Sequence, residues 1–452
     1  IADRSVAGLA LDGTTVDFGV MGSGAGAIDL QGKDLVVGSG NATLKLNAQL
    51  SDLDGDDGSA AMTGADSITL IKNIADNDDE NITINVEGGE NNRYKQAIYQ
   101  NGSDSPVAYI LGALGGWEYT GSEGDYDLIA NLTNDTLAIV SEYVVSKDGD
   151  IGLDITDYGS DAGNAGNLTI TGEGVEVTLS GDQNTYSGKT SVASGATLTL
   201  GVNRALGQTS ELSVDEYSTV EFGTTDQTVG ILNSDGTLVS DAKPRGTLTV
   251  THGGQVSGSN TGFHMDIVLD GTDDLTIKDV SALGDGQITI SQVGTSLRLS
   301  GILSDSGTAA TYANRVTGAG GLSIQNGSTI KLTGENDFTG DLVLDATSTV
   351  VADGDIYSHI GKGSLKLNSD VNSDARAEFT LSDSSSGDWT WSKHVTGDGV
   401  LALDRTSNAA NGGELLLGAG SISDFSGQLW LKNWGITLNA NGDANGMIAA
   451  LK

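Results

Sequence analysis

Three aspartates at alternate positions are the residues in this sequence that most resemble a metal site. The segment SDLDGDDG at 51–58 contains Asp52, Asp54 and Asp56, and calcium-binding loops present carboxylate ligands at this spacing. An EF-hand loop would continue with a glycine and a glutamate, where this chain has an aspartate and a threonine. We therefore predict no metal and no other cofactor. The segment is interpreted as a solvated acidic turn, with calcium binding by the three aspartates as the alternative.

The histidines, which a serine nucleophile would need as a general base, lie in no recognisable catalytic motif. The chain has four of them: His252, His264, His359 and His394. Paired carboxylates, as in GTDD at 271–274, could act as acid and base on a glycosidic bond. However, a chain with 61 acidic residues contains such pairs by chance. The sequence therefore predicts that the protein is not an enzyme, and a polysaccharide-active enzyme is the third-ranked hypothesis.

Four basic residues recur at similar intervals and form a first candidate ligand-binding site. They are Lys278, Arg298, Arg315 and Lys331, and the spacing varies little from one to the next. If the chain coils with a similar period, these side chains would line a thin basic stripe suited to a sulfated polysaccharide. Arg298 lies between two leucines, so alternation places it on the opposite face from them. Scattered positions are the alternative interpretation.

Residues 90–150 concentrate aromatic side chains and form a second candidate site. They hold seven of the 22 aromatic residues of the chain. The stretch ILGALGGWEY at 110–119 indicates a loop excursion from the regular structure. Aromatic side chains on loops commonly anchor protein or sugar partners, so Trp117, Tyr119 and Tyr126 are candidate ligand-binding residues. The alternative is that these rings pack the excursion onto the rest of the protein.

The elements that must position these residues are short strands. Apolar residues alternate with small polar ones in ATLTL at 196–200, GTLTV at 246–250 and SLRLS at 296–300. This period of two is typical of half-buried strands, and turns rich in Gly, Asn and Asp separate them. The chain has 66 glycines, two prolines and no cysteine among 452 residues. An all-β fold is predicted, because proline removes ladder hydrogen bonds and is almost absent.

The spacing of the strands indicates a coil. Leu322, Leu342 and Leu365 begin equivalent apolar pairs at nearly equal spacing. A period of roughly 20 to 25 residues without helices is typical of a solenoid, in which successive turns share one core. We predict a right-handed parallel β-helix with three strands per turn and loop excursions. A β-sandwich array is the competing interpretation.

A longer sequence unit occurs three times. VTGAGGLSI at 316–324 and VTGDGVLAL at 395–403 resemble each other, and NAGNLTI at 164–170 resembles both less closely. Each is followed by an aromatic residue, a hydroxyl residue and a glycine. The aromatic and glycine positions are Tyr186 and Gly188, Phe338 and Gly340, and Phe425 and Gly427.

This combined unit resembles the passenger-associated repeat of bacterial autotransporters, most closely in the AIDA-like adhesins of the type V secretion route. The repeats span 164–440, and residues 1–160 share the composition. The resemblance implies a single β-helical passenger domain over 1–452. It also implies export through the periplasm, anchoring at the outer membrane and display on the surface of a Gram-negative cell. The protein's own C-terminal outer-membrane barrel is expected to lie outside this chain. The repeated rings are expected to fill the core, and the glycines to make bends.

Charge restricts the partners. A net charge of −39 repels nucleic acid, which we exclude as a partner. With the resemblance, we predict a virulence-associated adhesin that binds host extracellular matrix, fibronectin or glycosaminoglycans, and promotes bacterial adhesion and colonisation. The alternative is homotypic contact between copies, which would drive aggregation and biofilm formation.

Overall fold

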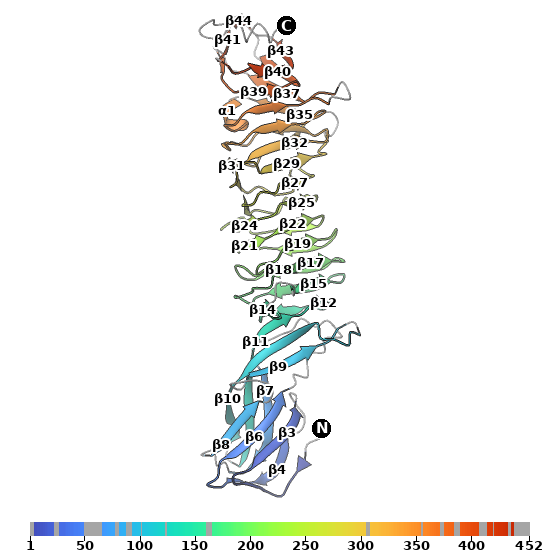
Figure 1. The fold of residues 1–452 in the computed structure, drawn as a ribbon. Helices are drawn as coiled ribbons and strands as arrows, with labels where there is room; N and C mark the ends of the chain where they lie inside the picture. Colours follow the sequence, from blue (N-terminus) through green and yellow to red (C-terminus); the bar gives the residue numbers. More distant parts are fainter. Residues whose placement is uncertain are drawn as a thin grey trace. The chain divides into compact units, whose positions relative to one another are not determined.

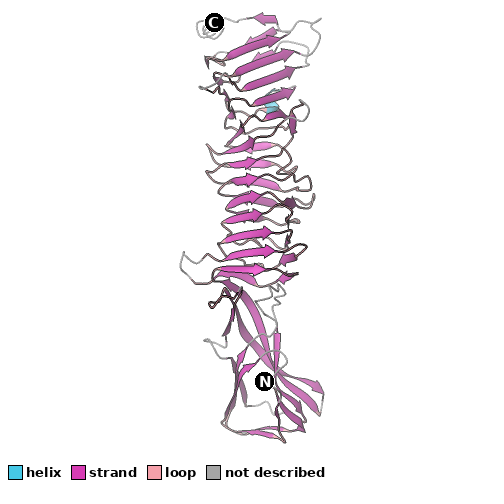
Figure 2. Ribbon diagram, turned by 90° about the vertical axis from the view of Figure 1, so that its right-hand side faces the viewer, coloured by secondary structure: helices cyan, strands magenta, loops and turns pink. Residues whose placement is uncertain are grey.

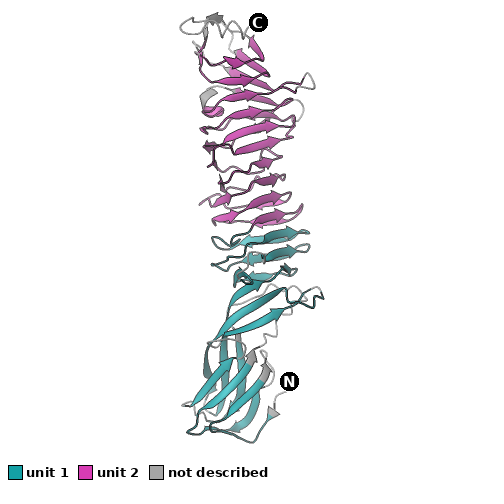
Figure 3. Cartoon of the chain, in the orientation of Figure 1, with its two compact units in different colours: residues 1–209 teal, residues 210–452 magenta. Residues whose placement is uncertain are grey.

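The fold is that of a computed structural model, and the chain divides into two compact units, residues 1–209 and 210–452 (Figure 3). The structure describes residues 4–21, 27–48, 66–76, 81–86, 93–100, 102–122, 124–159, 165–303, 308–353, 356–370, 375–383, 389–405, 414–418, 420–432 and 435–437. Strands account for nearly all the regular structure, as Figure 2 shows. The all-β prediction is therefore confirmed. The single-domain prediction over 1–452 stays a prediction, and each unit is described by itself.

Residues 210–452 form a parallel β-helix in which each turn contributes short strands to separate sheets (Figure 1). The first sheet contains β19 (Glu211–Val214), β22 (Ile231–Ser234), β25 (Gly254–Val256), β27 (Leu275–Ile277), β29 (Ser296–Ser300), β32 (Gly321–Gln325), β34 (Leu342–Leu344), β36 (Leu365–Leu367), β39 (Val395–Gly397) and β42 (Asp424–Phe425). The second sheet contains β30 (Ala310–Tyr312), β33 (Thr329–Leu332), β35 (Thr349–Asp353), β37 (Glu378–Asp383), β40 (Val400–Arg405) and β43 (Gln428–Lys432). The third sheet contains β21 (Gln227–Val229), β24 (Thr247–Val250), β26 (Asp266–Leu269), β28 (Ile288–Ile290) and β31 (Val316–Gly318).

Shorter ladders complete this unit at its two ends. They are formed by β20 (Thr219–Glu221) with β23 (Thr237–Val239), and by β38 (Trp389–Trp391), β41 (Glu414–Leu417) and β44 (Gly435–Thr437). A one-turn helix, α1 (Ile356–His359), precedes β36. All strand pairs in these sheets are parallel, which excludes a sandwich of hairpins for the described residues of this unit.

The register confirms the predicted period. Leu322 pairs with Leu342, and Leu342 pairs with Leu365, so each of the two predicted intervals is one turn of the coil. Buried residues alternate with more exposed ones along most of these strands, and all three leucines are fully buried. Stacked leucines at equivalent positions share one continuous core, because a single turn could not shield its own apolar face from water.

Residues 1–209 contain a mixed sheet as well as parallel ladders. The mixed sheet is formed by β1 (Arg4–Ser5), β4 (Ile28–Lys33), β7 (Asp66–Ile74), β11 (Asp125–Ile139), β10 (Ala108–Ser122), β9 (Arg93–Ile98) and β14 (Asp154–Asp157). The parallel ladders are β2 (Leu9–Leu11) with β5 (Leu35–Val37); β3 (Thr15–Met21), β6 (Ala42–Ala48) and β8 (Ile82–Val86); β12 (Glu142–Val145), β15 (Asn167–Thr171) and β17 (Lys189–Ala193); and β13 (Gly149–Ile151), β16 (Glu176–Leu179) and β18 (Thr197–Leu200).

The stretch predicted as a loop excursion within 90–150 is regular β-structure instead. Strands β10 and β11 have 15 residues each and pair antiparallel, with a short connection between them. The loop prediction was wrong because GALGG at 112–116 was read as a turn. Register shifts at this glycine-rich stretch absorb extra residues within the ladder as β-bulges, so the strand continues through it.

Candidate ligand-binding sites

The four basic residues of the predicted stripe lie on three sheets, and only Lys278 and Arg298 share one, on adjacent turns. Arg298 lies on the first sheet, with Thr276 and Ser323 as its neighbours in the adjacent turns. Arg315 directly precedes β31 of the third sheet, and Lys331 belongs to β33 of the second. Lys278 follows β27 of the first sheet. The structure therefore does not bring these side chains together as a stripe.

Turn length explains the failure of the stripe. Leu275 pairs with Leu297 and Leu297 with Leu322, so each turn in this region is longer than any interval between successive basic residues. Because each interval is shorter than one turn, each successive basic residue lies at a different position around the coil from the one before it. Both arginines are also ion-paired, Arg298 with Asp274 and Arg315 with Asp337, although Arg298 and Arg315 do face outward as predicted.

The predicted calcium ligands Asp52, Asp54 and Asp56 lie outside the described residues. Among the residues that are described, no three histidine, aspartate or glutamate side chains converge in a way that could hold a metal ion. No helix in the described part of the chain is long and apolar enough to cross a membrane.

The rings of the repeated tripeptides fill the core, as expected. Tyr186 and Phe338 are fully buried and Phe425 is almost so. Burial raises the pKa of the Tyr186 phenol, although its 2.8 Å hydrogen bond to the Thr190 hydroxyl opposes this shift. A buried phenol needs a polar partner, and the Thr190 hydroxyl provides it from the strand that follows Tyr186.

The glycines of the tripeptides make the expected bends and also have a second role. None of Gly188, Gly340 and Gly427 has a positive φ, so they do not supply a left-handed bend. Each also lies against a glycine in the preceding half of the repeat. A Cβ on Gly188 would lie 2.3 Å from the Gly166 carbonyl oxygen, one on Gly340 2.5 Å from that of Gly320, and one on Gly427 2.1 Å from that of Gly399.

This contact explains why the two halves of the repeat occur together. The half with G-x-L forms one turn, and the half with [YF]-[ST]-G forms the next. Leu168 pairs with Thr190, Leu322 with Leu342, and Leu401 with Leu429, in each case just after the stacked glycines. The leucine pair of the copy at 316–324 belongs to the first sheet, whereas that of the copy at 395–403 belongs to the second sheet. The repeat therefore specifies how two successive turns stack, and it does not specify the sheet on which they do so.

Sequence reasoning missed a set of buried asparagines that link successive turns. Asn336 accepts a hydrogen bond from the Val316 backbone N–H and donates to the His359 carbonyl, both at 2.7 Å. Asn184 and Asn260 make the same two kinds of bond, each to one residue of the preceding turn and one of the following turn. The signal was present in the sequence, since NTYSG and NDFTG share an asparagine at the second position before the ring.

The three candidate aromatic residues do lie together. Trp117 and Tyr119 occupy alternate positions on β10 and so face the same side of the hairpin, and Tyr126 comes from β11. The ring centroids of Trp117 and Tyr119 are 6.0 Å apart, and those of Tyr119 and Tyr126 are 6.4 Å apart, both in edge-to-face geometry. All three side chains are half-buried. We call this set the aromatic face of the hairpin.

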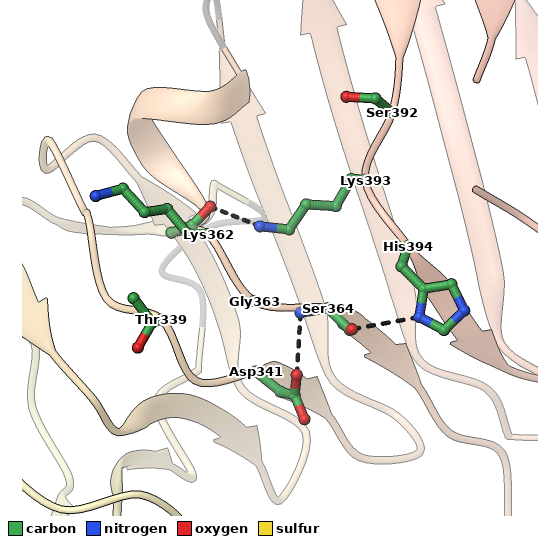
Figure 4. A pocket seen from close by; sticks show the side chains of 9 residues that line it. Thr339, Asp341, Lys362, Gly363, Ser364, Ser392, Lys393 and His394 are labelled. Atoms are coloured by element: carbon green, nitrogen blue, oxygen red, sulfur yellow. Dashed lines mark hydrogen bonds between the residues drawn. The ribbon is translucent and has the colours of Figure 1, made fainter. Parts of the chain in front are cut away.

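A polar cleft, which sequence reasoning also missed, lies in residues 339–394 (Figure 4). It has a volume of about 590 Å³ and is bordered by three consecutive turns, just before β34, β36 and β39. Its lining residues are Thr339, Asp341, Gly361, Lys362, Gly363, Ser364, Ser392, Lys393 and His394. None of them has a purely hydrocarbon side chain, so the cleft suits a hydrated polar ligand and not an apolar one.

Lys393 is the buried cation of this cleft. It is only 5% exposed, and its ammonium group donates to the carbonyl oxygens of Gly361 at 2.5 Å and Ile360 at 3.4 Å. Burial lowers the Lys393 pKa to about 8, and the nearby Asp341 carboxylate opposes that shift. The group is therefore largely charged at neutral pH but loses its proton at a lower pH than an ordinary lysine.

Asp341 lies across the cleft and is held by two donors. Its carboxylate accepts the Ser364 backbone N–H at 3.0 Å and forms a 2.7 Å ion pair with Lys366. Burial acts to raise its pKa, but these contacts outweigh burial and the pKa lies below the usual value. Asp341 is thus a carboxylate at neutral pH, and Lys366 neutralises it.

Ser364, His394 and Asp424 form a chain of contacts at the edge of the cleft. The Ser364 hydroxyl lies 3.3 Å from Nδ1 of His394, whose Nε2 lies 2.9 Å from an Asp424 carboxylate oxygen. The order resembles a nucleophile, base and orienting acid. In such sites the acid is buried and a backbone N–H stabilises the oxyanion, whereas the Asp424 side chain is 66% exposed and the Ser364 N–H already donates to Asp341.

No protein-family model matches the chain, and no solved structure matches it. The chain is 26% identical over 340 residues to a curated protein of Escherichia coli (strain K12), the uncharacterized protein YuaQ. The match covers 62% of this chain and 23% of that protein, so the chain spans about a quarter of the length of the relative it matches.

Proposed function

We propose that this chain is part of a cell-surface adhesin that binds host extracellular matrix, fibronectin or a glycosaminoglycan, through the aromatic face of the hairpin. The observation that carries the proposal is the clustering of Trp117, Tyr119 and Tyr126 on one side of β10 and β11. Half-buried aromatic side chains combine a large apolar surface with polar edges, which makes them frequent anchors for protein and sugar ligands.

Support also comes from the kind of scaffold. The proposed location is the outside of a Gram-negative cell, reached by type V secretion, as the repeat resemblance implies. Within residues 1–209, the two paired 15-residue strands of the hairpin hold the three rings on regular backbone structure. The basic stripe is less well supported as an anchor, because its members lie on three sheets and its two arginines are ion-paired.

The test is a solid-phase binding assay with fibronectin and heparin immobilised in separate wells. The double variant Trp117→Ser, Tyr119→Ser should lose at least about tenfold in affinity for one of them, because truncating central aromatic anchors typically removes about 2 kcal/mol or more. The matched control is Tyr99→Ser, since Tyr99 is also a surface aromatic of this unit but lies outside the cluster. Equal binding by the double variant and the control would refute the proposal.

Self-association is the competing outcome of the same experiment. Light scattering of the purified chain, without any matrix component, measures contact between copies. Concentration-dependent aggregation that the double variant abolishes, with no binding to either coated well, would assign the aromatic face to homotypic contact and favour aggregation and biofilm formation instead. Circular dichroism of each variant checks that the β-structure is retained.

A further inference from the structure

The polar cleft lies where the β-helix changes its turn length. Leu342 pairs with Leu365, and Leu365 pairs with Val395, which makes the second of these turns markedly longer than the first. The extra residues include the start of a new ladder at β38, whereas the first sheet keeps its register. A longer turn does not stack evenly on a shorter one. The mismatch leaves space at the corner of the coil that precedes β34, β36 and β39 of the first sheet. The cleft lies at this corner (Figure 4).

The lining of the cleft combines cations with hydroxyl groups. Lys393 and Lys362 supply two ammonium groups, and Asp341 is already neutralised by Lys366. An ammonium group has three N–H donors, and Lys393 directs two of them to backbone carbonyls, which leaves one for a ligand. Thr339, Ser364 and Ser392 add hydroxyl groups that can donate or accept.

This set of groups matches one class of ligand better than others. Lysine ammonium groups favour a carboxylate or a sulfate, whereas the Asp341 carboxylate accepts hydrogen bonds from hydroxyl groups. A ligand with both an anionic group and several hydroxyl groups satisfies both halves of the lining. A nucleotide base or a lipid chain would find no aromatic or branched aliphatic side chain among the lining residues.

We propose that the cleft binds one anionic sugar unit of an acidic polysaccharide, with the carboxylate or sulfate group held by Lys393 and the hydroxyl groups by Asp341 and Ser364, while Lys362, whose side chain points away from Lys393 in Figure 4, adds positive charge at the edge. This site goes beyond the aromatic face, lies on other residues, and holds or fails independently of it. A chain with a net charge of −39 repels anions at a distance, so the attraction must be local to the cleft. Neighbouring sugar units would extend into solvent and make few contacts.

The test is a calorimetric titration of the whole chain with four defined glycans. Heparin oligosaccharides carry sulfate and carboxylate, hyaluronan oligosaccharides carry carboxylate only, dextran sulfate carries sulfate only, and dextran carries neither. Binding of at least one charged glycan and not of dextran is expected. Comparison of hyaluronan with dextran sulfate distinguishes the two anionic groups. Equal binding of dextran, or binding of none of the four, would overturn the proposal.

Two variants tie the binding to the cleft. Lys362→Glu reverses an exposed charge at its edge, and Lys278→Glu makes the same charge change on an exposed lysine elsewhere in the unit. The first should lower the affinity about tenfold, the scale of one charge-assisted hydrogen bond, and the second should leave it within about twofold. Equal losses would show a nonspecific charge effect and refute the site. In the background of the aromatic-face double variant, Lys362→Glu should still lower the affinity for hyaluronan or dextran sulfate about tenfold, which separates this proposal from the adhesin proposal.

A chemical readout accompanies the titration. Mass spectrometry of the oligosaccharide after overnight incubation should show an unchanged length. Shortening of the oligosaccharide would overturn a purely binding role in favour of catalysis.

Discussion

Removing the ring of Phe338 should strongly destabilise the unit formed by residues 210–452. The side chain is fully buried, and Gly361 of the next turn approaches it so closely that a Cβ there would lie 2.6 Å from a ring carbon. Such tight packing leaves little room for collapse after truncation. Phe338→Ala should therefore reduce the free energy of unfolding by about 3–5 kcal/mol, from lost transfer free energy plus the cavity. That loss is a large fraction of the roughly 5–15 kcal/mol typical of a whole domain.

Hydrogen exchange by mass spectrometry is the appropriate assay, because a chain with two compact units need not unfold in a single step. In a solenoid each turn contacts mainly its neighbours, so protection should fall first in residues 320–367 and less in β19 to β25. The control is Trp430→Ala, which removes a large aromatic side chain that is 53% exposed, and should change stability by about 0.5 kcal/mol or less. Unchanged exchange around β34 in Phe338→Ala would refute the core role of the repeated ring.

Three further changes test other parts of the fold. Asn336→Ala leaves a buried N–H and a carbonyl of adjacent turns without a partner, and urea unfolding should show a loss of about 2–3 kcal/mol that Asn336→Asp partly avoids. Gly340→Ala pushes a methyl group against the Gly320 carbonyl, and thermal unfolding should reveal a loss of about 1–3 kcal/mol; an unchanged melting temperature would contradict the stacked-glycine contact. Lys393 has a lowered pKa of about 8 when folded and an ordinary one when unfolded, so between these values the unfolded chain binds more protons. The free energy of unfolding of the parent, relative to Lys393→Met, should therefore rise as the pH is raised from neutral through the folded pKa, and a fall would show that the ammonium group is stabilised by its surroundings.

The features that repeat in every turn could be predicted from the sequence. Leu322, Leu342 and Leu365 pair as their spacing indicated, because the period of apolar residues reports directly on which side chains share the core. The burial of the repeated aromatic rings was also predicted, because they too recur in the repeated unit. The bends at Gly188 and Gly340 were also predicted, but their contact with a carbonyl of the adjacent turn was not, because the sequence alone does not show which glycines a neighbouring carbonyl approaches.

The candidate sites depended on features that do not repeat. Arg298 and Arg315 would align only if the interval between them equalled one turn, and the turns in this region are longer than that interval. In the cleft, by contrast, a turn of unusual length brings the site residues together. Ser364 and His394 are separated in the sequence by more than any period visible in the shorter turns, yet the long turn before β39 stacks them directly.

The structure of the solenoid gives a reason to look for function at such irregular turns. Core positions such as Leu342, Leu365 and Val395 remain in register whatever the length of the chain between them, because the ladder hydrogen bonds and the stacked apolar side chains are local to the first sheet. An insertion at a corner therefore disturbs only its two neighbouring turns. New chemistry can arise there with little loss of stability, whereas a substitution within the repeated ladder affects the core directly. By this argument the change from a shorter to a longer turn before β39 is the place where a binding site can form in this unit, and the residues that line the cleft lie there.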